Sequence, residues 1–384
     1  MQIQNDTYSL DIFIDGLNIF EAPGVVFLDA RIIERLDDPI PVCTLRLSVP
    51  LGWINQRSIV DGTKIRFDLR SKKFELSESL YFRLFDITRL SIEQKFCTIE
   101  LNGVLDFHPG YRFYNRFNLY GSSSDVFTEV AKYFNLNSSI DITNDYQLWA
   151  SGENDLYQHL NMIAQYGWVD ETSAMIWAFD RRKTLLYKNL TQLFRNRNQK
   201  CWSFIQIPSK YDSKEKIYGY SNGTVMISSG TENILHEGYG GDDTYFDFPS
   251  YSWKKPSARK VVAESNLINI SKELSNGLAT NWYPFDVGNF HKNYWLARKQ
   301  NARIKATYST YAIIQCQYLM NYRLGQIVKF ILMDSQNNKN TVQMASGIYI
   351  ITAITIHFTK QDITSSLKLA MQGLNGQAIT RETY

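Results

Sequence analysis

The stretch Asp61-Gly-Thr-Lys-Ile-Arg-Phe67 has a counterpart near the other end of the chain, Leu324-Gly-Gln-Ile-Val-Lys-Phe330. Each stretch places a glycine turn before an outgoing strand and carries a phenylalanine at the same offset from that glycine. Turn–strand units look alike in many all-β proteins, so chance similarity is the alternative interpretation. The repeat signature consists of Gly62, Phe67, Gly325 and Phe330.

Two further segments recur in the same order. Leu80-Tyr-Phe82 leads to Asp86-Ile-Thr88, as Ile348-Tyr-Ile350 leads to Ala353-Ile-Thr355. Then Cys97-Thr-Ile-Glu-Leu-Asn-Gly103 is matched with Ser366-Leu-Lys-Leu-Ala-Met-Gln-Gly373. Three strands that recur with similar spacing predict two homologous barrels in one chain.

The flanking sequence fits this duplication. Hydrophobic and polar residues alternate repeatedly through residues 1–112, which is the period of half-buried strands and predicts the first, tube-like β-barrel. Strand-rich sequence at 206–245 and 308–375 predicts the second. The alternating sets are Tyr8–Ile14, Cys43–Val49, Ile65–Leu69, Leu80–Leu84 and Cys97–Leu101.

Residues 113–205 change to a helical period and predict an α+β insert. Gly121-Ser-Ser-Ser-Asp125 is a helix start, and a second helix runs from Glu153 to Tyr166, with Gly167 at the place of a left-handed C-terminal cap. A hairpin of Ala174–Phe179 and Thr184–Tyr187 follows. We expect Trp149 to anchor this insert against its helices; the alternative is an interface aromatic.

The predicted fold class is therefore mainly β with α+β inserts: two similar antiparallel β-barrels plus two inserted subdomains. The second insert, 246–307, contains a helix expected from Asp286 to Lys305, and 376–384 form a C-terminal tail. A length of 384 residues accommodates two to four domains, and 24 Tyr and 22 Phe favour sheets.

Composition excludes several classes of protein. A net charge of +3 does not predict strong nucleic-acid binding, although DNA in transit is compatible with it. Cys43, Cys97, Cys201 and Cys316 have no zinc-finger spacing and are expected to be free thiols, as in a reducing cytoplasm. No signal peptide or transmembrane helix is expected, so the sequence predicts no membrane anchoring.

The insert and the overall order of segments resemble the baseplate hub of T-even phages and the related late-control D and valine-glycine-repeat spike proteins. The matching residues are Ser124-Asp-Val-Phe-Thr-Glu-Val-Ala-Lys-Tyr-Phe134, Trp149, Glu153-Asn-Asp-Leu156 and Ile163-Ala-Gln-Tyr-Gly167. Trp149, Asp155 and Gly167 form the structural signature of the insert. Unlike valine-glycine-repeat proteins, this chain ends just after its second barrel, so we expect a separate spike protein.

The resemblance implies a non-enzymatic hub subunit in the virion tail baseplate, made in the host cytoplasm. It implies a homotrimer whose six barrels form a pseudo-sixfold ring around a channel. The partners expected are a hexameric tail tube protein, a trimeric spike protein and other baseplate proteins, with DNA only in transit. A tail-tip protein of a non-contractile tail is the nearest alternative; a cell-wall hydrolase and a carbohydrate-binding tail protein are more distant ones.

Motifs for catalysis or metal binding are weak. His108, His159, His236, His291 and His357 fit no zinc pattern, and no nucleophile elbow is expected, so no cofactor, metal or catalytic residue is predicted. We expect His159 to be solvated and His357 to be packed in a strand. Three groups of charged residues have both a structural and a binding interpretation. Asp242, Asp243 and Asp247 lie in a Gly-rich loop and are either solvated or calcium ligands, and Glu153 and Asp155 either begin a helix or act as paired carboxylates. Lys254, Lys255, Arg259 and Lys260 near Trp253 are either a flexible basic loop or a site for single-stranded nucleic acid.

Overall fold

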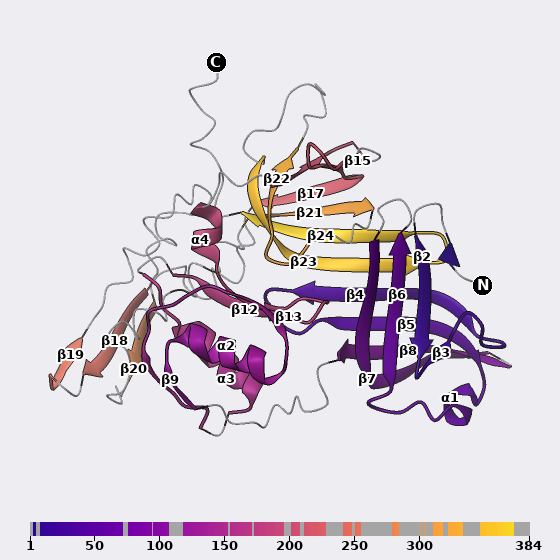
Figure 1. The fold of residues 1–384 in the computed structure, drawn as a ribbon, viewed down its shortest axis with the longest axis horizontal. Helices are drawn as coiled ribbons and strands as arrows, with labels where there is room; N and C mark the ends of the chain where they lie inside the picture. Colours follow the sequence, from indigo (N-terminus) through magenta and orange to yellow (C-terminus); the bar gives the residue numbers. More distant parts are fainter. Residues whose placement is uncertain are drawn as a thin grey trace, which may run out of the picture.

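One large sheet dominates the molecule and includes strands from both ends of the chain (Figure 1). The computed structural model describes residues 3–4, 8–71, 76–93, 95–106, 118–152, 154–170, 173–195, 201–207, 211–227, 241–247, 250–254, 279–283, 300, 304, 310–317, 322–332 and 346–371. Within these residues the fold is mainly β with α+β inserts, which confirms the predicted fold class.

The first half of the sheet follows the order β1-β2-β6-β7-β8-β5-β4, with β3 paired to β2. Strands β2 and β6 and the first part of β7 run across β4, β5 and β8 (Figure 1). The elements are β1 (Ile3–Gln4), β2 (Ser9–Ile14), β3 (Leu17–Asn18), β4 (Val26–Arg35), β5 (Val42–Pro50), α1 (Trp53–Gln56), β6 (Lys64–Ser71), β7 (Leu76–Glu93) and β8 (Phe96–Leu105). The sequence predicted five of these strands and missed β4 and the two short strands β1 and β3.

The second half of the sheet continues from β4 through β23. Its strands pair in the order β17-β21-β24-β23-β22-β14-β16-β15, and β14 is parallel to both β22 and β16. The elements are β14 (Trp202–Ile205), β15 (Tyr211–Asp212), β16 (Ile217–Gly219), β17 (Asn222–Ile227), β21 (Thr310–Gln317), β22 (Ile327–Ile331), β23 (Gly347–Thr359) and β24 (Ile363–Met371). Strand β14, which the sequence-based boundary assigned to the first insert, therefore pairs with the second half.

The duplication is visible in the strand pairing. The antiparallel order β6-β7-β8-β5-β4 recurs as β22-β23-β24-β21-β17. Gly62 and Gly325 occupy equivalent turns, with φ of 83° and 76°. The amide of Gly62 donates to the carbonyl of Leu84, and that of Gly325 to the carbonyl of Ile351, each at 2.8 Å. Five strands and their leading turn thus occur twice.

A β-bulge recurs at the same place in both halves. The β7–β8 ladder shifts between Leu84 and Asp86, and the β23–β24 ladder shifts between Ile351 and Ala353. A bulge inserts one unpaired residue and increases the local twist of the strand. The bulge therefore recurs at equivalent positions, although the β7–β8 ladder has a second shift, between Arg89 and Ser91, that the β23–β24 ladder lacks.

The pairing corrects the sequence match in the second segment. Phe82 lies opposite Ile65, and Tyr349 lies opposite Val328, so Phe82 is equivalent to Tyr349 and not to Ile350. The match was wrong by one residue. Ile350 and Ile351 are both fully buried, so alternation does not reveal which face of β23 meets which neighbour.

The third segment was wrong by four residues at its end. Gly103 pairs with Leu84, and Leu369 pairs with Ile351, so Gly103 is equivalent to Leu369 and not to Gly373. A Cβ atom on Gly103 would lie 2.8 Å from the Cys43 sulfur. This glycine therefore serves close packing inside one barrel, and it does not mark a repeated turn.

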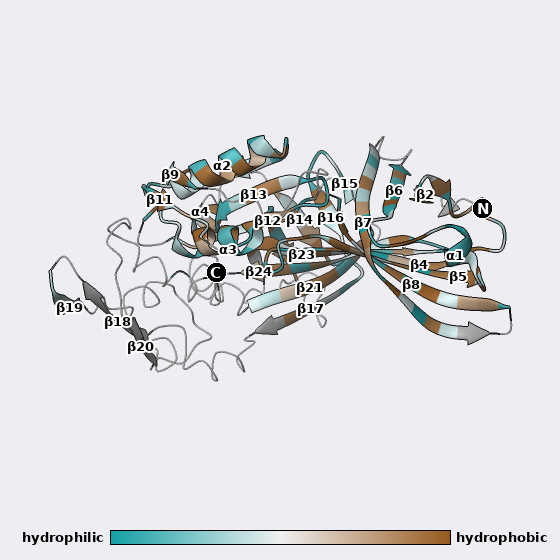
Figure 2. Ribbon diagram, turned by 90° about the horizontal axis from the view of Figure 1, so that it is seen from below, coloured by the Kyte–Doolittle hydropathy of each residue, from teal (hydrophilic) through white to brown (hydrophobic). Residues whose placement is uncertain are grey.

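The first insert has its own small sheet, β10-β13-β12, in which β10 is parallel to β13. Helices α2 and α3 pack against this sheet (Figure 1), and β9 pairs with β11 beside them (Figure 2). The elements are β9 (Leu119–Gly121), α2 (Ser123–Tyr133), β10 (Asn137–Ile140), β11 (Gln147–Trp149), α3 (Leu156–Tyr166), β12 (Met175–Phe179), β13 (Thr184–Asn189) and α4 (Leu190–Arg195). Both predicted helices and the predicted hairpin are confirmed.

Local sequence sets the ends of the two longer helices. Ser122 begins α2 with a capping box to Asp125, and Asp155 begins α3 with a capping box to Gln158. Because Asp155 is the cap, α3 starts later than predicted. His159 of α3 is fully buried, so the expectation that it is solvated was wrong.

The core is formed by the alternating apolar residues of the large sheet, whose strands switch between hydrophobic and hydrophilic residues (Figure 2). A second cluster lies where the insert packs on the second half and includes Ile176, Leu190 and Ile350. A further sheet, β19-β18-β20, contains β18 (Gly241–Asp247), β19 (Ser252–Lys254) and β20 (Ala279–Tyr283). In the described part of the chain, no helix has the length and hydrophobicity needed to cross a membrane.

Candidate assembly interface

The two halves meet where β4 pairs antiparallel with β23. Ile32 lies opposite Ile356, and Ala30 opposite Phe358; all four side chains are fully buried. Across this junction the ring of Phe358 stacks on that of Phe67 from β6, with centroids 5.6 Å apart. Burial of this apolar surface and a continuous ladder make the two barrels one body.

The strands equivalent to β4 and β23 have open edges. Strand β17 is equivalent to β4, and among the described strands it pairs with β21 alone. Strand β7 is equivalent to β23, and beyond Arg83 none of the described strands pairs with it on the side away from β8. Unpaired amides and carbonyls at such edges favour pairing with another strand.

Exposure differs between the junction and the open edges. Ile356 and Ile32 are fully buried. Arg89, the equivalent of Ile356, is exposed, and Val225, the equivalent of Ile32, is half-buried. Leu90, beside Arg89, is 49% exposed. Positions that are buried at the β4–β23 junction are therefore accessible to solvent at the unpaired edges of β17 and β7.

The face of the first half opposite the core carries a polar network that crosses four strands. Arg46 donates to Glu100 at 2.8 Å and lies 3.8 Å from Asp29. Asn102 accepts from Thr44 at 2.9 Å and donates to Asp86 at 3.2 Å. Arg46 thus neutralises Glu100, while Asp29 and Asp86 add two further carboxylates, so the face is polar and carries charges of both signs.

A buried ion cluster ties the first insert to both halves. Arg181, in the β12–β13 turn, donates from its backbone amide and its guanidinium to Glu34 of β4, at 2.7 and 2.5 Å. Its Nε lies 3.3 Å from Glu78 of β7, and its Nη2 donates to the carbonyl of Tyr322. Burial raises the pKa of Glu34, and Arg181 opposes that effect. The arrangement fixes the position of the hairpin.

Within the insert, Asp145 is a fully buried carboxylate that the sequence analysis did not select. It accepts from the Ser123 amide at 2.8 Å, the Ser123 hydroxyl at 2.6 Å and the Trp168 amide at 2.7 Å. Tyr187 bonds to the same Ser123 hydroxyl, and burial raises its pKa. All are closed to solvent and Asp145 lies at a helix N-terminus, so the cluster is structural.

Two of the three signature residues of the insert, Trp149 and Gly167, have separate roles. Trp149 is buried and donates from its indole to the carbonyl of Gly121, at 3.1 Å. Gly167 ends α3 with φ −60° and ψ 141°, so the predicted left-handed cap was wrong. A Cβ at Gly167 would lie 2.0 Å from the Tyr187 hydroxyl, which is why only glycine fits. Gln300 donates to the last carbonyls of α3, at 2.7 and 2.6 Å.

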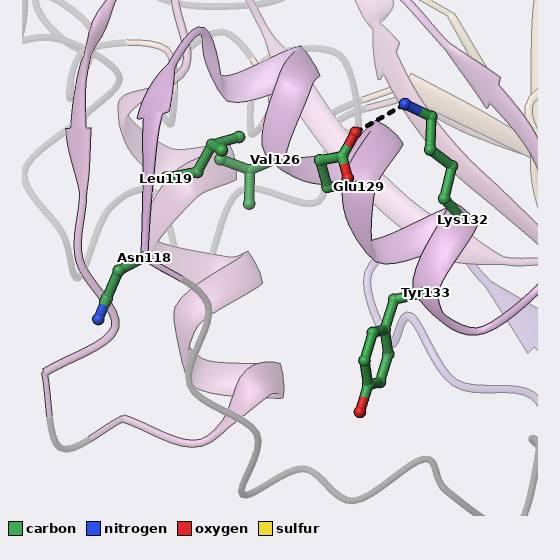
Figure 3. A pocket seen from close by; sticks show the side chains of 6 residues that line it. All are labelled: Asn118, Leu119, Val126, Glu129, Lys132 and Tyr133. Atoms are coloured by element: carbon green, nitrogen blue, oxygen red, sulfur yellow. Dashed lines mark hydrogen bonds and ion pairs between the residues drawn. The ribbon is translucent and has the colours of Figure 1, made fainter.

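The outer surface of the insert is partly apolar and aromatic. Tyr120 and Leu148 lie opposite each other on β9 and β11 and are 76% and 48% exposed, and Tyr146 is exposed beside them. An open pocket of about 410 Å³ lies between β9 and α2 (Figure 3). Its lining includes the surface ion pair Glu129–Lys132 and no cluster of catalytic groups.

The remaining candidates give no chemical site in the part of the chain that the structure describes. No group of three metal-ligating side chains occurs there. Asp242, Asp243 and Asp247 lie in strand β18, so the predicted loop is wrong at these positions. His357 lies in β23, as predicted, and burial lowers its pKa. Lys255, Arg259, Lys260 and most of the predicted Asp286–Lys305 helix lie outside the described residues.

Comparison with known proteins rests on structure. No family model matches the sequence, and no curated protein matches it. The 43 kDa tail protein of prophage MuSo2 from Shewanella oneidensis has a TM-score of 0.57 at 9% identity, covering 95% of this chain and 99% of that one. A tail protein from Neisseria meningitidis MC58 has a TM-score of 0.56 at 10% identity, covering 96% and 98%.

The chain has the fold of phage tail proteins. Nearly the whole length of each compared chain is covered, so the similarity includes both barrels and the inserts. At such low identity it establishes the fold and not the activity, because one fold supports many functions.

Proposed function

We propose that the chain is a structural, non-enzymatic subunit of the baseplate of a phage-type contractile tail. Three copies form a hub that joins a hexameric tail tube to a trimeric spike. The observation that carries this proposal is the repeated order of five antiparallel strands with its bulge. Three copies with two equivalent barrels each offer six similar surfaces to a sixfold partner.

The inserts supply the threefold side of the hub. The first insert occurs once and, in the part of the chain that the structure describes, has no counterpart in the repeat, so three copies present three such surfaces. Its exposed Tyr120, Tyr146 and Leu148 are suited to a protein partner, since aromatic residues are enriched in interfaces. We assign this surface to the spike or to other baseplate proteins of the virion.

The polar face of the large sheet lines the channel in this proposal. Its acidic and basic groups pair with each other, as in Arg46 with Glu100, and DNA contacts require free cations on a surface. A lining whose cation is already paired with a carboxylate lets a polyanion pass without tight binding. This agrees with a chain that has 41 basic and 38 acidic residues.

The mass of the purified protein and the symmetry of its particles test the proposal. We expect light scattering to give three times the 44.6 kDa of the chain. Electron microscopy should show a ring with nearly sixfold symmetry on one face and threefold symmetry on the other. A stable hexamer, or a ring in which a single barrel of each chain takes part, would contradict the adapter role.

A further inference from the structure

The junction inside the chain is a template for a junction between chains. In the template, Ile32 of β4 lies opposite Ile356 of β23, and Glu34 lies opposite Ile354. Both pairs point into the core, and the polar face contains the alternate residues. Any strand pair that repeats this junction must keep the same register, because a one-residue slip moves core residues to the polar face.

The ladders define the equivalent positions without superposition. Ala30 lies opposite Leu45, and Gly223 opposite Ile314, so β17 follows β4 along the repeat and Ile32 is equivalent to Val225. On the other strand, Leu84 and Ile351 precede the bulge. Ile87 is therefore equivalent to Ile354, and Arg89 to Ile356.

We propose that β17 of one copy pairs antiparallel with the second part of β7 of the next copy, with Val225 opposite Arg89 and Ile227 opposite Ile87. This inference rests on the proposed trimeric hub and identifies its subunit interface. Repetition of the internal junction at each boundary gives six equivalent junctions in a closed ring of three chains. The strands β17-β21-β24-β23-β4-β5-β8-β7 of the three copies then form one closed ring.

Three observations on the separate strands support this pairing. Neither edge has a partner among the described strands, so both are available to form a second junction like that between β4 and β23. Of their core-facing positions, Ile87 and Val225 are half-buried and Arg89 is exposed, whereas the template positions Ile354, Ile32 and Ile356 are fully buried. Phe85, the extra residue of the β7 bulge, is 53% exposed, while its equivalent, Thr352, is 3% exposed under the junction.

Disulfide trapping distinguishes this register from its neighbours. The test uses the full chain with Cys201→Ser, because Cys201 is half-buried while Cys43, Cys97 and Cys316 are buried. Arg89→Cys with Val225→Cys places two thiols directly opposite. The matched control is Ile87→Cys with Val225→Cys, in which the thiols are diagonal and about 7–8 Å apart between their Cα atoms.

Under oxidation, the direct pair should convert most chains into covalent dimers and closed trimers, with no larger species on a non-reducing gel. The diagonal pair should crosslink at least about tenfold less, because Cα separations beyond about 7 Å do not fit a disulfide. A variant that carries only one of the two new cysteines should form no covalent trimers on the same gel.

The outcomes separate this inference from the hub proposal. Trimers by light scattering with equal or stronger crosslinking of the diagonal pair overturn the register and leave the hub in place. Crosslinking of the direct pair into ladders beyond three chains supports the register and overturns the closed trimer. Monomers that form neither crosslink overturn both.

Discussion

The two halves of the sheet share a backbone arrangement and differ in the chemistry of their polar face. In the first half, Asp29, Arg46, Glu100 and Asp86 form a charged network. The equivalent positions of the second half are Asn222, Gln315, Ser366 and Ala353, and Asn222 donates to Gln315 at 3.1 Å. Strand order, turn and bulge persist in both halves, while the side chains on the polar face have diverged.

A second difference lies in what holds each half in place. The position of Glu34, which pairs with Arg181, is equivalent to Ile227 in the second half. The first half is therefore joined to the insert by buried charge. The second half meets the insert through the apolar cluster around Ile350 and Leu190, and its Tyr322 contributes a backbone carbonyl, not a charge, to the Arg181 cluster.

Removal of the buried arginine should have the largest effect. Arg181→Ala leaves Glu34 without its cation in a fully buried position, and breaking such a pair costs about 3–5 kcal/mol. The free energy of unfolding, measured in urea, should fall by this amount. Adding Glu34→Gln should restore part of the loss, because it removes the unpaired buried charge. Glu78 keeps Arg182 as a partner in both variants. A loss below about 1 kcal/mol would show that the insert is held by apolar contacts alone.

A methyl group at the end of α3 should be the next most disruptive change. Gly167→Ala places a Cβ where the Tyr187 hydroxyl lies, and overpacking of this kind costs about 1–3 kcal/mol. The same urea titration measures the loss. Tyr187→Phe removes the obstructing oxygen, so the double variant should be more stable than Gly167→Ala with tyrosine retained. No difference between these two variants would contradict the close-packing role.

Paired substitutions at the two repeat turns test the equivalence itself. Gly62→Ala and Gly325→Ala each place a Cβ in open space but at positive φ, which costs about 1–2 kcal/mol. We expect the two changes in unfolding free energy to agree within about 0.5 kcal/mol. Unequal losses would indicate that the two turns, although alike in geometry, contribute differently to the free energy of unfolding. Thermal unfolding monitored by circular dichroism is sufficient.

The charged face of the first half should give a small pH effect that the second half lacks. The Arg46 guanidinium lowers the pKa of Glu100, so this carboxyl stabilises the folded state above its unfolded pKa and loses that contribution as pH falls through the folded pKa. Because the pair is partly exposed, Glu100→Gln should cost less than about 1 kcal/mol at pH 7 and nothing at pH 2–3. Ser366→Ala, at the equivalent site, should show no such dependence.

Sequence alternation was informative wherever a strand has one polar face. It gave β5, β6 and β8 correctly, since each of these strands buries every second residue. It failed in β23, because the insert covers the second face and Ile350 is as buried as Ile351. Alternation cannot specify register where both faces of a strand are apolar.

The candidate interface was predicted only in outline. The repeat around Gly62 and Gly325 indicated two barrels, but pairing between β4 and β23 depends on residues more than 300 positions apart and has no local pattern. Asp145 was missed for a similar reason: an isolated aspartate in a polar stretch gives no sign that it will be buried. His159 was misplaced because a polar residue on a helix was assumed to face water.

The junction between β4 and β23 also sets an order for folding. Strands β1 to β8 lie within residues 3–105, whereas β14 and β22 are parallel partners separated by more than 100 residues. Local sheets form faster than distant pairings, so we expect the first half to fold early during synthesis and the second half late. Until β23 is made, β4 presents a bare edge that invites aggregation. The early barrel is thus both the template on which the late one is built and the part of the newly made chain that most needs protection.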